Sequence, residues 1–255
     1  MLKLSAPIIV LILFGAAFQT TIAKESIYRT DVNGSRSFQI KPSESDDPRK
    51  AAIARTQQIV VEIVEASFPE LRTASIRIKT FKSRSDYFRS QFSISRFLTF
   101  RKLHFIIYVN PSVFERNAPA DGIRAIIAHE LAHADYYRRH NRLKLLGLVG
   151  LYSKSFTARF ERGADLQAIK RGHGLGLKEY REWLYANIPA EKIAAKKRNY
   201  FSPAEIDLLL DGLRQNPEQI DFWLTNVPRN ASEIRSNTLF TRALDRSPCG
   251  VLPAC

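Results

Sequence analysis

Residues 126–134 read Ile-Ile-Ala-His-Glu-Leu-Ala-His-Ala, and this stretch governs the interpretation of the rest of the chain. Apolar side chains recur around it at helical spacing, which predicts a helix from Pro119 to about His140. Residues four apart on a helix lie on one face, about 5 to 6 Å apart. The imidazoles of His129 and His133 can therefore reach one metal ion.

Glu130 is the third polar residue of this stretch. It is rotated by about 100° from His129 around the helix axis, so its carboxylate can lie beside a metal ion without binding it. A metal-activated water needs a general base at such a place. The alternative is a surface helix with solvated histidines, but the apolar neighbours indicate a half-buried face on which polar groups need partners.

Two carboxylates on the next predicted helix, residues 155–171, are candidate partners. Glu161 and Asp165 are again four apart and share a face. Catalytic zinc usually has three protein ligands and an open position. One carboxylate can complete that set, while the other accepts the free ring N–H of a ligating histidine. The alternative is a solvated acidic stripe, which the apolar Leu166 and Ile169 disfavour.

His-Glu-Leu-Ala-His, followed 28 residues later by Glu-Arg-Gly-Ala-Asp-Leu-Gln-Ala, resembles the gluzincin metallopeptidases. The similarity is greatest to the family of the HtpX-type and CAAX-prenyl endopeptidases and their soluble periplasmic relatives. The resemblance implies that His129, His133 and Glu161 bind one zinc ion and that Glu130 acts as base and proton shuttle. It also implies that Asp165 orients a ligand histidine, with His129 preferred.

The resemblance covers residues 123–171 and implies a zinc-dependent endopeptidase acting on a peptide or protein substrate. The family stabilises the oxyanion with a later His, Arg or Tyr, which no motif marks here; the candidates are His173, Tyr137 and Tyr152. The alternative function is a catalytically silent, zinc-peptidase-like binding or assembly factor of the cell envelope. The intact Glu130 disfavours that alternative, because a scaffold without catalysis has no need for this carboxylate.

The expected fold is α+β, a helix-dominated gluzincin-like zincin with a small sheet beside the central helix. The apolar spacing predicts further helices over residues 48–67, 177–187 and 203–214, and strands over residues 74–81 and 103–109. The second strand directly precedes the central helix. We expect it to be an edge strand that pairs with an extended peptide, or alternatively a plain core strand.

Composition limits the function in other ways. The 255 residues carry 39 Lys and Arg against 25 Asp and Glu, a formal net charge of +14. This excess favours anionic surroundings, so envelope polymers are candidate partners through basic runs at residues 138–139 and 196–198. Nucleic acid is not expected, because no recognition motif accompanies these runs. Two cysteines exclude a cysteine-rich metal site.

The N-terminus has the features of a secretory signal peptide. Lys3 precedes an apolar run over residues 8–18, and Thr-Ile-Ala at 21–23 offers a cleavage site between small residues. The run is shorter than the about 20 residues of a membrane span, which favours cleavage over an uncleaved signal-anchor. We expect an exported protein, periplasmic or secreted, without a transmembrane helix in the mature chain.

The sequence thus predicts four parts of the chain. These are a signal peptide over residues 1–23, a polar leader over 24–47, a single metallopeptidase domain over 48–246 and a C-terminal tail over 247–255. The tail contains Cys249 and Cys255, which we expect to form a disulfide in an oxidising compartment. A redox or metal pair is the alternative, disfavoured because the spacing is not that of a CxxC motif.

Overall fold

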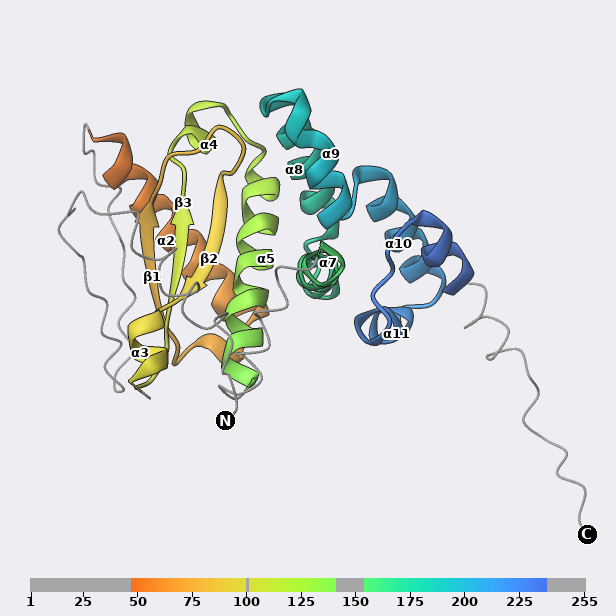
Figure 1. Cartoon of the computed structure of the whole chain (residues 1–255), viewed down its shortest axis with the longest axis horizontal. Helices are drawn as coiled ribbons and strands as arrows, with labels where there is room; N and C mark the ends of the chain where they lie inside the picture. Colours follow the sequence, from red (N-terminus) through yellow and green to blue (C-terminus); the bar gives the residue numbers. More distant parts are fainter. Residues whose placement is uncertain (1–46, 100, 141–153, 238–255) are drawn as a thin grey trace, which may run out of the picture.

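The computed structural model describes residues 47–99, 101–140 and 154–237 (Figure 1). The helices include α2 (Pro48–Ser67), α3 (Ile94–Leu98), α4 (Ser112–Glu115), α5 (Ala120–Arg139), α7 (Lys154–Lys170), α8 (Gly174–Asn187), α9 (Ala190–Asn199), α10 (Pro203–Gln215), α11 (Gln219–Thr225) and the short 3-10 helix η1 (Pro69–Leu71). The strands are β1 (Ser75–Thr80), β2 (Phe88–Phe92) and β3 (His104–Val109). The predicted α+β, helix-dominated class is confirmed.

The three strands form one mixed sheet in the order β1-β3-β2. β1 is parallel to β3 and β2 is antiparallel to it. The prediction that the strand over residues 103–109 lies at a sheet edge is therefore wrong. Its inward-facing side chains, Phe105, Ile107 and Val109, are fully buried, and a strand this apolar is stable in the centre, where both of its edges are paired. β1 and β2 occupy the two edges instead.

α2 begins and packs as its sequence predicts. The carboxylate of Asp47 accepts a hydrogen bond from the backbone N–H of Arg49, and Pro48 occupies the first turn, where its missing N–H costs nothing. One face of the helix is buried against the sheet and α5, and Ile63 on this face is fully buried. α2, the sheet and α5 share the larger of two apolar cores.

α5 is the central helix of the molecule. In Figure 1 it stands between the sheet on one side and α7 and α8 on the other, in agreement with its contacts. α8 lies especially close because glycines line the crossing: a Cβ atom on Gly176 would collide with the backbone carbonyl of Asp121, and one on Gly122 would press on Tyr180. Polar side chains on α5 are consequently held among buried neighbours, and His129 and Glu130 are both buried.

The smaller core joins α7, α8, α10 and α11. α7 ends as predicted before Gly172, whose positive φ of 87° suits glycine at the end of a helix. α10 begins with a capping box in which Ser202 and Glu205 satisfy each other's backbone N–H groups. α7 also packs against α5. This contact brings the carboxylates of Glu161 and Asp165 toward His129 and His133.

Several expectations fall on residues outside the described ranges. They are the signal peptide, nearly all of the leader, the C-terminal tail with both cysteines, and Tyr152. Within the described part of the chain, no helix is both long enough and apolar enough to cross a membrane.

Candidate metal centre

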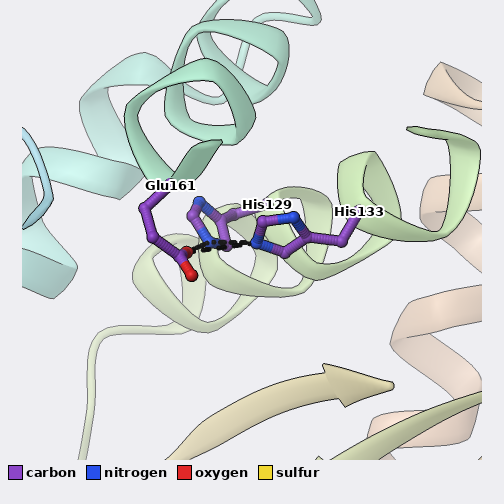
Figure 2. A group of neighbouring side chains, drawn as sticks. All are labelled: His129, His133 and Glu161. Atoms are coloured by element: carbon purple, nitrogen blue, oxygen red, sulfur yellow. Dashed lines mark hydrogen bonds and ion pairs between the residues drawn. The ribbon is translucent and has the colours of Figure 1, made fainter. Parts of the chain in front are cut away.

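Three side chains from two helices converge on one point (Figure 2). His129 and His133 lie one turn apart on α5, with their Nε2 atoms 3.2 Å from each other. Glu161 reaches them from α7, and its Oε2 lies 3.2 Å from Nε2 of His129 and 3.1 Å from Nε2 of His133. The three atoms form a nearly equilateral triangle of ligand-type atoms. This group could hold a metal ion.

The cluster is buried but not sealed. The histidine side chains are 2% and 6% exposed, whereas Glu161 is 19% exposed. Phe160, the residue before Glu161, stacks on the ring of His133 with centroids 4.6 Å apart. Packing therefore holds the ring of His133 in place, and the most exposed side of the cluster is that of Glu161.

Asp165 fixes the orientation of His129. Its Oδ1 lies 2.7 Å from Nδ1 of His129, and it is fully buried. A carboxylate there accepts the Nδ1–H, so that Nε2 is the ring nitrogen directed at the other two groups. The backbone N–H of Phe201 donates to Oδ2 of Asp165 at 3.1 Å. The structure therefore brings Asp165 to the histidine that the sequence analysis preferred.

Arg181 is a part of the site that the sequence analysis missed. It lies on α8, is buried, and donates from Nη2 to Oδ1 of Asp165 at 2.9 Å. Its position on a buried stripe with Leu177 and Leu184, at spacings of four and three, was the available signal. Together with His129, the Arg181 guanidinium lowers the pKa of Asp165 against the effect of burial, so this carboxylate stays ionised.

In the metal-free cluster, the positively charged imidazolium of His129 lies beside the carboxylates of Asp165 and Glu161. Burial disfavours the imidazolium of His129, but Asp165 and Glu161 outweigh that effect and raise its pKa to about 10. Burial likewise opposes the ionised form of Glu161, yet His133 and His129 lower its pKa well below the usual range. Glu161 is thus an anion, ready to bind a cation, and a cation must displace the proton of His129.

Glu130 lies next to a cavity of about 20 Å³, which His129 and Tyr200 also line. A cavity needs about 10–15 Å³ to hold one water molecule, so this one has space for a water beside residues that include Glu130 and His129.

Two phenols lie beside the ligand-type residues. The ring of Tyr137 stacks on His133 with centroids 6.4 Å apart, and the ring of Tyr200 is tilted against His129 at 5.8 Å. Burial and the nearby Glu161 raise the pKa of both phenols, so each hydroxyl keeps its proton and is a hydrogen-bond donor. Tyr200 follows the last residue of α9, and sequence periodicity gave no sign of its position.

His173 is not brought to the cluster. It precedes α8, and its Nε2 lies 3.3 Å from Oγ of Ser67, at the end of α2. The nine helical steps from Glu161 to the end of α7 alone span about 14 Å. The structure therefore offers no role for His173 at the site.

The basic runs of the sequence are partly neutralised within the molecule. Arg139 pairs with Asp135 at 2.7 Å, and Arg138 approaches the same carboxylate at 3.4 Å. Lys196 pairs with Asp86 at 2.6 Å. These contacts reduce the charge that either run presents to an anionic polymer.

Comparison of the chain with family models, with curated proteins and with solved structures found no match in any of the three. The function is therefore inferred from the geometry of the site itself.

Proposed function

We propose that this chain is an exported zinc-dependent endopeptidase with a gluzincin-like fold, which hydrolyses peptide bonds at the cluster of His129, His133 and Glu161. The observation that carries this proposal is the triangle of two Nε2 atoms and one carboxylate oxygen, with edges of 3.1 to 3.2 Å. Glu130 stands beside it as the general base.

The dimensions of the triangle fit zinc. Nitrogen and oxygen ligands lie about 2.0–2.1 Å from zinc, and a tetrahedral arrangement then separates them from one another by about 3.3 Å. Two imidazoles and one carboxylate are also a known ligand set of catalytic zinc, with the fourth position open. Bound there, zinc would supply Lewis-acid chemistry, polarising the scissile carbonyl and acidifying a water.

The remaining chemistry belongs to side chains of the chain. Glu130 takes a proton from the attacking water and passes it to the leaving amine. Asp165, held by Arg181, keeps His129 in the tautomer that ligates through Nε2. Tyr200 lines the same cavity as Glu130, which favours its hydroxyl over that of Tyr137 as donor to the oxyanion.

The sheet offers a place for the main chain of the substrate. β3 is paired on both sides, whereas β2 is an edge strand and packs against α5, the helix of the histidines. An extended peptide would therefore add to the sheet at β2, beside the cluster, by main-chain hydrogen bonds.

Peptide hydrolysis by the zinc-loaded protein tests the proposal. A mixed peptide library, analysed by mass spectrometry, should show internal cleavage that a chelator abolishes and added zinc restores. Glu130→Gln should keep about one zinc and lose hydrolysis, because an amide cannot accept the proton. Unchanged turnover in this variant would remove Glu130 as the base. A wild type that holds zinc but cleaves nothing would instead be the metal-retaining binding or assembly factor.

A further inference from the structure

A second cavity adjoins the cluster on the side of His133. It has a volume of about 460 Å³ and lies between α5 and α7, with Leu224 and Val227 at and after α11 lining part of it. This volume falls within the range of about 300–1,000 Å³ that is usual for ligand sites. Because His133 is itself part of the wall, the cavity borders the candidate metal centre at this residue.

Part of the wall of this cavity is aromatic. Tyr136, Phe156 and Phe160 line it, and Phe160 contacts both Tyr136, at 5.2 Å between centroids, and His133. Asp135, Arg139 and Arg159 line another part of it; Asp135 pairs with Arg139, and Arg159 donates to the backbone carbonyl of Thr225. The aromatic part of the wall favours a flat, apolar group.

Gly163 keeps the cavity open. It lines the wall in the middle of α7, and a Cβ atom added to it would meet nothing within 4 Å. Its backbone lacks the positive φ that favours glycine, and within a helix glycine costs about 1 kcal/mol relative to alanine. Neither backbone geometry nor close packing calls for glycine at this position. What its missing side chain provides is space.

We infer that this cavity is a specificity pocket, which receives a large aromatic or aliphatic side chain of the substrate residue next to the scissile bond. The inference rests on the proposed function and extends it to a substrate class. A carbonyl held at the cluster lies beside His133, so the side chain adjacent to that carbonyl has the aromatic wall within reach. Small side chains would leave this volume unfilled.

Hydroxamates of single amino acids test the pocket without requiring catalysis, because the hydroxamate group binds zinc and presents one side chain. For the zinc-loaded wild type, calorimetry should give at least about tenfold tighter binding of phenylalanine hydroxamate than of alanine hydroxamate. Gly163→Leu should abolish that preference, and Gly163→Ala should reduce it. Ala51→Leu, on the exposed face of α2, adds the same side chain elsewhere and should change nothing.

Each outcome of this experiment decides something. Gly163→Leu should still bind one zinc and melt no lower than the wild type, since leucine is the better helix former. The specificity pocket would be refuted if the wild type bound both hydroxamates equally well. It would also be refuted if Gly163→Leu kept the preference for phenylalanine hydroxamate. A preference that Gly163→Leu removes, in a protein that cleaves no peptide, would uphold the pocket and refute the endopeptidase. Absence of zinc binding would refute both.

Discussion

Nδ1 of His129 lies 2.7 Å from Oδ1 of Asp165, on a different helix 36 residues further along the chain. The same carboxylate oxygen lies 2.9 Å from Nη2 of Arg181 on a third helix. All three side chains are buried. The orientation of the first histidine is therefore set by a charged chain that crosses α5, α7 and α8, and not by α5 alone.

Asp165→Asn should weaken zinc binding by about 10- to 100-fold, the usual cost of losing such a partner behind a ligand. The amide is uncharged, and its NH₂ group would compete with the Arg181 guanidinium for space and acceptors. Competition with a chromogenic chelator measures the change. Asp211→Asn, which removes an exposed carboxylate on α10, is the control, and equal affinities for the two variants would remove Asp165 from this role.

Arg181→Met should lower the free energy of unfolding by about 3–5 kcal/mol, because it leaves the Asp165 carboxylate buried without its partner. Urea denaturation of the metal-free protein measures this loss. Arg229→Met is the matched control, since that arginine forms an exposed pair with Glu233 and should have little effect. A similar small change for both variants would mean that Asp165 does not depend on Arg181.

Zinc binding should release about one proton at pH 7.5. In the metal-free protein the pKa of His129 is about 10, so the ring is protonated at this pH and must lose its proton to ligate. Because the folded-state pKa lies above the unfolded value of about 6.5, this protonation stabilises the metal-free fold below pH 6.5. That contribution is lost as the pH rises through about 10.

Calorimetry in buffers of different ionisation enthalpy counts the protons released. Zinc affinity should also rise between pH 7 and 9. A binding enthalpy that is the same in every buffer would contradict a protonated His129 in the metal-free protein.

Tyr200→Phe should lower peptide hydrolysis by about 10²- to 10³-fold while zinc stays bound, if hydrolysis depends on its hydroxyl as oxyanion donor. Tyr137→Phe is the comparison, because that ring also stacks on a ligand-type histidine but is not among the residues lining the cavity beside Glu130. Initial rates with one quenched peptide give the ratio. A larger loss for Tyr137→Phe would mean that Tyr137, and not Tyr200, is the oxyanion donor.

Local sequence patterns predicted the elements whose signal is local. α2 and α10 have capping residues at their first turns, and α5 and α7 have apolar stripes. β2 was missed because only its end residues, Phe88 and Phe92, are apolar, as is common at an exposed edge. α9 was missed because it has no buried residue and hence no stripe. The central place of β3 depends on pairing between distant segments, which no local pattern specifies.

The same distinction holds for the candidate site. Glu161 and Asp165 could be named because residues four apart share a helix face. Arg181 could not be assigned a partner, since a lone arginine on a helix is usually exposed, and its carboxylate belongs to another helix. Tyr200 contacts His129 because α9 ends beside the cluster, and no local sequence pattern indicates where that helix ends in space.

Zinc stoichiometry is the most direct test of the central claim, that two histidines of α5 and a glutamate of α7 form one metal site. The purified protein, loaded with zinc and dialysed, is measured by elemental analysis beside Glu161→Ala and the control Glu179→Ala, an exposed glutamate on α8. We predict about one equivalent for the wild type and the control, and loss in Glu161→Ala. No bound zinc in the wild type, or a full equivalent retained by Glu161→Ala, would contradict the account.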